Sequence, residues 1–471
     1  TTAGGVSVAS GAALELQGAR TIGAEALTLN GTGISNTGAL RNIDSNSSWA
    51  GAITLGSASR INSDANTLTL SGGITGAYGL TFGGAGNVAV TGVIGTGAGT
   101  ITKDGTGKLI LSGTNTFTGA IAVTSGVLNL QNNAATGTTA GGVSVTSGAA
   151  LELQGARTIG AEALTLNGTG ISNTGALRNI DSNSSWAGAI TLGSASRINS
   201  DANTLTLSGG ITGAYGLTFG GAGNVTVNSV IGIGTGTLTK DGTGTLTLSG
   251  ANTYTGLTTV SAGTLAYGAS NVIANGASVN VSGGTLNIGA YSDTIAGLQL
   301  TSGTITGTTG ILTSTSTYNM QSGTVSAILA GTVGLTKTTS GTVTLSKANT
   351  YTGLTTISAG TLAYGVSNAI STGGITINGG TLSLGAYSDS VGAVTLTAGS
   401  ITGTGTLTST VGFTMNNTSN TSVSAILAGA VALTKSGTGT LTLSGANTYS
   451  GGTNINAGII ALASSGALGT T

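Results

Sequence analysis

The sequence predicts an all-β fold in which the chain winds as a right-handed parallel β-helix, or β-solenoid, with coils of about 19–20 residues. Three observations predict the solenoid: a glycine-rich composition, short apolar–polar alternations, and internal repeats whose lengths share a divisor. The 471 residues include 87 glycines and no proline. Where nearly all backbone N–H groups donate to neighbouring strands, proline is excluded because it has no N–H. The handedness comes only from the family resemblance described below.

The composition excludes several classes of function. Charged residues make up 5% of the chain, and twelve basic and twelve acidic residues cancel. Such a chain cannot present the basic surface that drives binding to nucleic acid. Cysteine and histidine are absent, so the chain lacks disulfides, thiolate metal sites and the commonest general base. We therefore expect no cofactor. No apolar run approaches the roughly 18 residues that a membrane span needs.

Two kinds of internal repeat set the expected length of a turn. Residues 1–88 recur as 138–225 with one difference, Ala9 against Thr146, which is an offset of 137. A second element occurs four times, and its Asn-Thr-aromatic core begins at Asn115, Asn252, Asn349 and Asn447, at spacings of 137, 97 and 98. Dividing 137 by seven, and 97 and 98 by five, gives values between 19.4 and 19.6. These values predict that all turns share one length, of about 19–20 residues.

Alternating aliphatic pairs support the same turn. They fall at Val6/Val8, Leu27/Leu29, Leu68/Leu70, Val88/Val90, Leu109/Leu111 and Leu128/Leu130, with Trp49 near the one skipped position. Apolar residues at i and i+2 are typical of half-buried strands. The Ser-Gly, Asn-Gly and Gly-Thr-Gly groups between them suit corners. We expect like residues of successive turns to stack in columns.

We expect residues 1–471 to form one continuous solenoid. Within it the sequence contains a duplication, 1–137 and 138–274, then two related repeats, 251–347 and 348–445, and the start of a further repeat at 446–471. The final Gly-Thr-Thr at 469–471 also occurs at 137–139, where the chain runs on. We therefore expect this sequence to be a fragment of a longer repetitive protein.

The second element resembles a known family. Residues 239–256 read Thr-Lys-Asp-Gly-Thr-Gly-Thr-Leu-Thr-Leu-Ser-Gly-Ala-Asn-Thr-Tyr-Thr-Gly, followed by Ser-Ala-Gly-Thr-Leu at 261–265. This stretch is similar to the passenger-associated transport repeat of autotransporter proteins. Residues 434–458 match nearly as well, 336–362 lack the Gly-x-Gly step, and 102–128 differ at Phe117 and Val127. The resemblance implies a right-handed β-helical passenger, displayed outside a Gram-negative bacterium.

Charged residues of the duplicated module are the candidate site. They recur at spacings close to one turn, so each sign is expected to form a vertical ladder at one corner. The candidates are Arg20, Arg41, Arg60, Glu25, Asp44 and Asp64, with their copies Arg157, Arg178, Arg197, Glu162, Asp181 and Asp201. Stacked carboxylates suit glycosidic chemistry or a shared cation, and the ladder could also bind polysaccharide. We favour a surface ion-pair ladder that sets the register of the turns.

Other motifs could carry a function, but for each of them a structural explanation is favoured over the functional one or is equally supported. Asp293 and Asp389 lie in Gly-Ala-Tyr-Ser-Asp, where an acid–Tyr pair could be catalytic but a corner turn is favoured. The lysines that precede Gly-rich turns, Lys103, Lys240, Lys337 and Lys435, are followed by no helix that would make a phosphate loop. Trp49 and Trp186 suit sugar stacking or core filling about equally. Thr-x-Thr pairs raise ice binding, but they come and go along the sequence.

The sequence therefore predicts a structural extracellular protein, a stiff stalk or fibre segment with no catalytic residues. Self-association, end-to-end or lateral, is the expected partnership, because an uncapped solenoid end exposes unpaired backbone groups and the net charge is zero. An adhesin that binds glycan or a host surface is the alternative. A carbohydrate-active enzyme is third.

Overall fold

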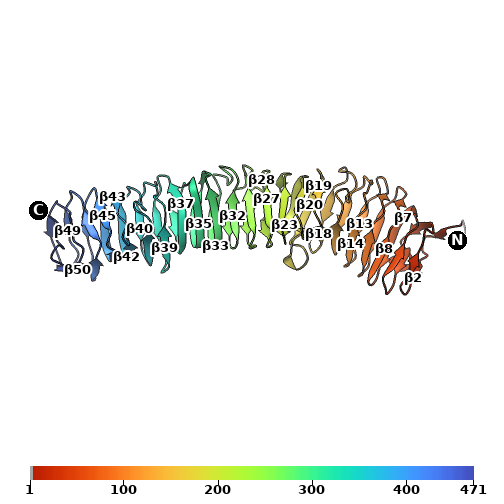
Figure 1. Ribbon diagram of the computed structural model, residues 1–471, viewed down its shortest axis with the longest axis horizontal. Helices are drawn as coiled ribbons and strands as arrows, with labels where there is room; N and C mark the ends of the chain where they lie inside the picture. Colours follow the sequence, from red (N-terminus) through yellow and green to blue (C-terminus); the bar gives the residue numbers. More distant parts are fainter. Residues whose placement is uncertain (1–3, 471) are drawn as a thin grey trace. The chain divides into compact units, whose positions relative to one another are not determined.

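The computed structural model describes residues 4–470, and the chain divides into two compact units, Thr1–Tyr254 and Thr255–Thr471. We call them unit 1 and unit 2. Each is a parallel β-solenoid, as the sequence predicts. In Figure 1 the strands of unit 1 run from red to yellow-green and those of unit 2 from green to blue. Among the described residues, helical structure is confined to two 3₁₀ turns of unit 1, η1 (Ile34–Asn36) and η2 (Ile171–Asn173).

Unit 1 consists mostly of very short strands. They are β1 (Val6–Val8), β2 (Leu14–Leu16), β3 (Thr21–Ile22), β4 (Leu27–Gly31), β5 (Leu40–Asn42), β6 (Ser47–Trp49), β7 (Ile53–Ser63), β8 (Thr67–Leu70), β9 (Ile74–Thr75), β10 (Leu80–Gly83), β11 (Asn87–Val90), β12 (Ile94–Gly95), β13 (Ile101–Lys103), β14 (Lys108–Leu111), β15 (Ile121–Val123), β16 (Val127–Leu130), β17 (Val143–Val145), β18 (Ala150–Leu153), β19 (Thr158–Ile159), β20 (Leu164–Gly168), β21 (Leu177–Asn179), β22 (Ser184–Trp186), β23 (Ile190–Ser200), β24 (Thr204–Leu207), β25 (Ile211–Thr212), β26 (Leu217–Gly220), β27 (Asn224–Val227), β28 (Ile231–Gly232), β29 (Leu238–Lys240) and β30 (Thr245–Leu248).

Unit 2 has longer strands among short ones, because several strands turn a corner without a break. They are β31 (Thr258–Val260), β32 (Thr264–Tyr267), β33 (Ser278–Gly289), β34 (Asp293–Ile295), β35 (Gly297–Ser314), β36 (Tyr318–Met320), β37 (Gly323–Ala330), β38 (Leu335–Lys337), β39 (Thr342–Leu345), β40 (Thr355–Ile357), β41 (Thr361–Tyr364), β42 (Ile375–Ser383), β43 (Asp389–Val391), β44 (Val394–Thr402), β45 (Thr406–Ser409), β46 (Phe413–Met415), β47 (Thr421–Val423), β48 (Ile426–Ala428), β49 (Leu433–Lys435), β50 (Thr440–Leu443), β51 (Thr453–Ile455) and β52 (Ile459–Leu462).

The predicted aliphatic columns are confirmed where the turns are regular. Leu68 pairs with Val88, Val88 with Leu109, and Leu109 with Leu128, so each of these steps is close to the expected turn. All four side chains are at most 2% exposed, so they form a continuous inward column. Parallel strands bring equivalent residues of successive turns ~4.8 Å apart. The hydrophobic core therefore runs through each unit as stacked Leu, Ile and Val.

The duplicated module of unit 1 does not make the seven equal turns that its length suggested. Around η1 one turn is much longer than the others, because it leads from Leu14 to its register partner Leu40. Six register steps lead from Leu14 to Val145, whereas the copy of Leu14 is Leu151, further along the chain. Equivalent residues of the two copies therefore lie in different columns, and the division of 137 by seven is wrong.

Trp49 is displaced by the same long turn. The column of Leu27 continues to Ile53 and not to Leu68, so the skipped position assigned to Trp49 does not exist in that column. Trp49 stacks instead on Leu70 in the next turn. The spacing of residues along the sequence does not reveal the inserted residues. It gives the number of residues between two positions and not where each residue lies on its turn.

The related repeats of unit 2 behave as predicted. Five register steps lead from Val260 to Ile357, and five more lead from Ile357 to Ile455. Each repeat therefore makes five turns, and the mean turn of unit 2 has the predicted length. Equivalent residues of these repeats share a column, which allows direct comparison of their surfaces.

Candidate functional site

The like-charge ladders predicted from the sequence do not form. The register partners of Arg41 are Glu15 in one adjacent turn and Asn62 in the other, and the partner of Arg60 is Thr81. Arg20 lies beside Ser47, whose hydroxyl accepts its backbone N–H at 3.4 Å. Because the turn around η1 is long, equal spacing along the chain no longer places Arg20, Arg41 and Arg60 in one column.

Opposite charges alternate from turn to turn instead. The guanidinium of Arg41 donates to Glu15 Oε1 at 2.8 Å and, through Nε, to Asp64 Oδ2 at 2.6 Å. These hydrogen bonds raise the pKa of Arg41, with Asp64 as the largest cause. One arginine thereby links three successive turns. The ion pairs join neighbouring turns. That they set the register of the turns, the role that we favoured for the candidate residues, stays a prediction.

The second copy extends this arrangement and buries it more deeply. Arg178 pairs with Glu152 at 3.3 Å and with Asp201, and Lys108 donates to the other Glu152 oxygen at 2.7 Å. The Glu152 side chain is 5% exposed, against 48% for the equivalent Glu15. Burial raises the pKa of Asp201, and its ion pair with Arg178 opposes that rise. Lys108 and Asn129, from earlier turns, both donate to Glu152 and help to bury it.

A second arginine spans two turns at once. Arg60 Nη1 and Nη2 donate to the two oxygens of Asp104 at 2.6 and 2.8 Å, while its Nε donates to Asn62 Oδ1 at 2.9 Å. Gly83 belongs to the turn between them, and a Cβ atom there would lie 2.0 Å from Arg60 Nη2. Glycine at 83 therefore leaves the space through which the arginine reaches its partner.

The copy of this clamp has the same geometry. Arg197 donates to Asp241 at 2.7 and 2.8 Å across Gly220. Sequence reasoning missed Asp104 and Asp241. The sequence did contain a signal for them. Of the four lysines that precede Gly-rich turns, which we call the motif lysines, only Lys103 and Lys240 are followed by aspartate. Those aspartates stand 44 residues after Arg60 and Arg197.

Most of the remaining candidates bond to backbone groups. Arg20 Nε donates to the Gln17 carbonyl at 2.7 Å, and Arg157 donates to the Gln131 carbonyl at 2.8 Å. Asp44 and Asp181 accept the N–H of Gly18 and Gly155, both at 2.8 Å. Burial raises the pKa of Glu162, which accepts hydrogen bonds from Gly142 and Thr136. The bonds of Arg157, Asp44, Asp181 and Glu162 also join one turn to another, whereas that of Arg20 lies within one turn.

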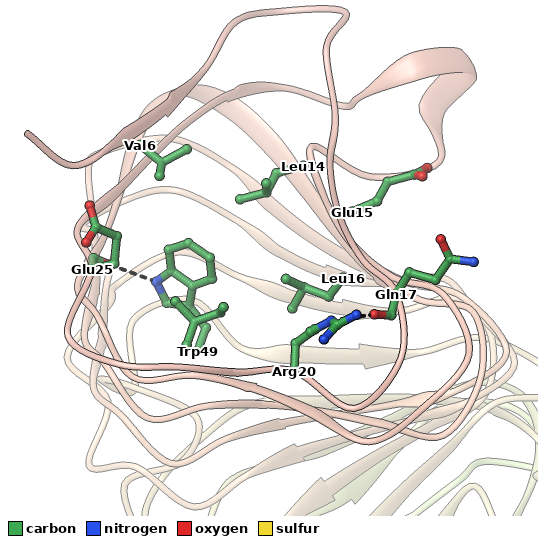
Figure 2. Close-up of a pocket in the computed structure, with 9 residues that line it drawn as sticks. Val6, Leu14, Glu15, Leu16, Gln17, Arg20, Glu25 and Trp49 are labelled. Atoms are coloured by element: carbon green, nitrogen blue, oxygen red, sulfur yellow. Dashed lines mark hydrogen bonds between the residues drawn. The ribbon is translucent and has the colours of Figure 1, made fainter. Parts of the chain in front are cut away.

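A pocket of about 530 Å³ lies at the first described turns of unit 1. Figure 2 shows Leu14, Leu16 and Trp49 facing its interior, with Glu15 directed away from it. In the second copy the equivalent residues Leu151, Leu153 and Trp186 are at most 2% exposed, because the preceding turn covers them. The pocket is therefore the stacking surface of a turn, and its residues are core residues.

The tryptophans fill the core and do not form sugar platforms. Trp49 and Trp186 are 2% and 0% exposed, and each indole N–H donates to a carbonyl of the preceding turn, that of Glu25 at 3.0 Å or Glu162 at 2.9 Å. A buried ring has no free face for a sugar. Of the two explanations weighed from the sequence, core filling is confirmed.

The aspartates of the Gly-Ala-Tyr-Ser-Asp motif are buried in unit 2. Asp293 and Asp389 are 2% and 3% exposed, and they accept the N–H of Ile273 and Ile370, both at 2.9 Å. Burial raises the pKa of both carboxyls, and a hydrogen bond from Tyr364 opposes the rise at Asp389. These contacts join successive turns, as expected of corner residues.

The four motif lysines, Lys103, Lys240, Lys337 and Lys435, are buried, which sequence reasoning missed. Each occupies an inward position: Lys103 stands between Phe82 and Val123, and Lys337 between Met320 and Ile357. The ammonium of Lys103 donates to the carbonyls of Gly105 and Ser125, and burial lowers its pKa to about 8. Leu-x-Lys alternation, which places lysine in phase with the core, was the available signal.

The motif asparagines connect three turns. Asn349 Oδ1 accepts the Leu329 N–H at 2.8 Å, and its Nδ2 donates to the Ala369 carbonyl at 2.7 Å. Asn115 makes the same pair of bonds, to Ile94 at 2.9 Å and Ala135 at 2.7 Å. The motif thus supplies one buried cation and one buried amide, each bonded to backbone groups that the core would otherwise leave without partners.

Two negative findings complete the description of residues 4–470. They contain no group of three or more histidine, cysteine, aspartate or glutamate side chains that could hold a metal ion. Within the same range, no helix has the length and apolar character to cross a membrane.

These features define a repeat β-solenoid whose charges join its own turns. The sequence model described as passenger-associated transport repeat matches residues 101–130, 238–266, 335–363, 367–384 and 433–462. The chain therefore contains this repeat, as its motifs predicted, and the segment 367–384 adds one that the sequence motifs had not indicated. Four of the five segments begin just before an inward lysine.

The chain is also similar to the adhesin BmaC autotransporter of Brucella suis biovar 1 (strain 1330). The two are 32% identical over 191 residues, which is 39% of this chain and 5% of that protein. The chain thus spans about one twentieth of the length of this relative. No solved structure matches the chain.

Proposed function

We propose that this chain is a structural segment of an autotransporter-like passenger, a stiff solenoid displayed outside a Gram-negative cell, which associates with itself. The carrying observation is that the charges singled out in unit 1 bond to neighbouring turns of the same chain, as Arg41 does with Glu15 and Asp64. Continuous strand ladders and stacked aliphatic columns then provide rigidity without disulfides. The transport repeats and the autotransporter relative support the location.

The surface of unit 2 supports self-association. Residues 255–471 include five charged side chains, Asp293, Lys337, Lys347, Asp389 and Lys435, and all except Lys347 are buried. Surfaces without net charge do not repel one another, so copies can approach laterally. The outward column Thr336, Thr356, Thr376, Thr395, Thr414 and Thr434 offers uncharged hydroxyl and methyl groups on six successive turns.

Sedimentation velocity over a range of concentrations tests this proposal. We expect oligomers to grow with protein concentration and to be largely insensitive to salt. Glutamate introduced on alternate turns, as Thr336→Glu, Thr376→Glu and Thr414→Glu, should shift the distribution toward monomer, while Thr→Ser at the same positions should leave it unchanged. A chain that stays monomeric at all concentrations would contradict self-association.

Adhesion is the second candidate function, because the relative's printed name is an adhesin. The charged columns of unit 1 are poor candidates for it, since their guanidinium groups already bind carboxylates. The enzyme hypothesis has the least support. Asp44 and Asp64, the carboxylates considered for catalysis, accept hydrogen bonds from Gly18 and Arg41 respectively.

A further inference from the structure

Three amides interrupt a threonine column on the outer face of unit 2. The column runs Thr259, Asn280, Gln299, Asn319, and then continues as Thr336 and the five threonines that follow it. The amides thus occupy three successive turns at a position that is threonine in the turn before them and in the six turns after them, up to Thr434, which Asn454 follows. All three side chains are half-buried, as expected for outward residues of a sheet.

The amides line a groove of about 380 Å³. Leu257, which is 42% exposed, lies at one end and Thr317 at the other. Gly297 lies between Ser278 and Ser316, because a Cβ atom there would lie 3.2 Å from one serine hydroxyl and 2.8 Å from the other. The volume falls in the range of small-molecule sites, roughly 300–1,000 Å³. The groove thus combines convergent polar groups with one exposed apolar side chain, that of Leu257, while Val279 and Leu298 in its lining are buried.

The groove amides are held in one network. Gln299 Nε2 donates to Thr301 Oγ1 at 2.8 Å, and Thr301 Oγ1 donates to Asn280 Oδ1 at 3.0 Å. Asn319 Nδ2 donates to Gln299 Oε1 at 3.4 Å. No group of the described residues accepts a hydrogen bond from Asn280 Nδ2. The network therefore fixes the orientation of the amides and leaves donor capacity for a ligand.

The related repeat provides an internal comparison. Residues 348–445 place Thr376, Thr395 and Thr414 in the same column, where 251–347 place Asn280, Gln299 and Asn319. Ala393, which precedes Thr395, stands where Gly297 stands before Gln299. The two repeats share the fold, so the amides and the glycine are not needed to form it.

We propose that this groove, lined by Asn280, Gln299 and Asn319 beside Leu257, binds a neutral oligosaccharide. Its lining residues are all uncharged, so it offers nothing to attract an acidic glycan. Amides both donate to and accept from sugar hydroxyls, and Leu257 can cover the apolar face of a sugar ring. The site specifies the adhesive alternative and rests on it. The structural role does not depend on it.

The test uses the whole chain on a printed array of neutral, sialylated and sulfated oligosaccharides, followed by calorimetric titration with the neutral oligosaccharide that gives the strongest signal. We expect a Kd that changes less than twofold between low and high salt. Asn280→Thr, Gln299→Thr and Asn319→Thr together should weaken binding at least tenfold, and Gly297→Ala should weaken it by narrowing the groove. Both variants only introduce residues that the related repeat already carries.

The related repeat also supplies the control and the reciprocal experiment. Thr376→Val, Thr395→Val and Thr414→Val should leave binding unchanged. Thr376→Asn, Thr395→Gln and Thr414→Asn with Ala393→Gly should raise the stoichiometry toward two.

The proposed site would be overturned if no neutral oligosaccharide binds the chain. It would also be overturned if binding survives in the triple threonine variant. Acidic glycan binding that is lost in salt would place adhesion elsewhere on the chain. Neither result bears on self-association, which sedimentation measures separately.

Discussion

The most direct test of the paired charges is the substitution Gly83→Ala. Arg60 reaches Asp104 across the turn that contains Gly83, and an alanine Cβ would lie 2.0 Å from Arg60 Nη2 and 2.5 Å from Asn62 Oδ1. The guanidinium would have to leave its position. The bidentate pair at 2.6 and 2.8 Å would then break, although neither charged residue has been altered.

The expected cost follows from the burial of the two partners. The Arg60 side chain is 10% exposed, so a displaced guanidinium remains largely away from water, while Asp104 at 32% exposure recovers part of its hydration. Breaking a fully buried pair costs ~3–5 kcal/mol, and hydrogen bonds to charged groups contribute ~1.5–3 kcal/mol. For this half-buried pair we expect a loss of about 2–3 kcal/mol.

Native-state hydrogen exchange is the suitable assay because a repeat protein opens locally and does not unfold in two states. Amides of residues 80–104 should exchange faster, whereas those of residues 217–241, which contain the intact Arg197–Asp241 clamp, serve as a reference in the same molecule. Gly73→Ala is the matched control, since its Cβ would meet only the Val93 carbonyl at 3.6 Å. It should change the opening free energy by less than about 0.5 kcal/mol.

A double-mutant cycle with Arg60→Met separates the clamp from a simple steric effect. Once the guanidinium is removed, Gly83→Ala should cost less than half of its original amount. Equal costs in the two backgrounds, or exchange no faster than in Gly73→Ala, would refute the idea that Gly83 exists to let Arg60 pass.

Two further predictions concern the transport-repeat motif. Burial lowers the pKa of Lys103 and Lys240 to about 8 in the folded chain, against 10.5 when unfolded. Between these two pH values the unfolded chain therefore binds more protons than the folded chain. Thermal stability should accordingly rise from pH 8 toward pH 10. Above pH 10 stability should fall, because burial raises the pKa of Tyr318 to about 12; a melting temperature that is flat between pH 8 and 10 would contradict the lysine assignment. Asn349→Ala should deprive the Leu329 N–H of its acceptor and lower the opening free energy of the Leu329 amide by about 1–3 kcal/mol in hydrogen exchange. The control Asn378→Ala, at an exposed position, should have no measurable effect. Unchanged protection of the Leu329 amide in Asn349→Ala would count against the role of Asn349 in connecting turns.

The fold could be predicted because its two signals do not depend on distant contacts. Alternation of period two identifies strands, and each of the two related repeats divides into five turns, as the column from Val260 to Ile357 confirms. The inward lysines were also within reach, since Leu-x-Lys places Lys337 in phase with the core. They were overlooked because a buried ammonium is unusual unless carbonyl groups receive it.

The threonine pairs show what sequence spacing conceals. They come and go along the chain, yet single outward threonines align on six successive turns from Thr336 to Thr434. Only Thr-x-Thr pairs were considered from the sequence, so this column of single threonines was not identified there. The three amides before Thr336 became visible as a group only once the column was known, because many other pairs in this sequence are also spaced by about one turn.

The amino-acid sequence by itself determined the class of fold, the inward and outward phases of the strands, and the presence of transport repeats, because each depends on local pattern or on copying of segments. The tertiary structure alone decided which charges meet. One long turn at η1 shifts every later column of the module, so Arg41 faces Glu15 and Asp64 and does not stack with Arg20 or Arg60. Position on a turn depends on the summed lengths of all preceding corners, and a single insertion there reassigns the neighbours of every side chain that follows.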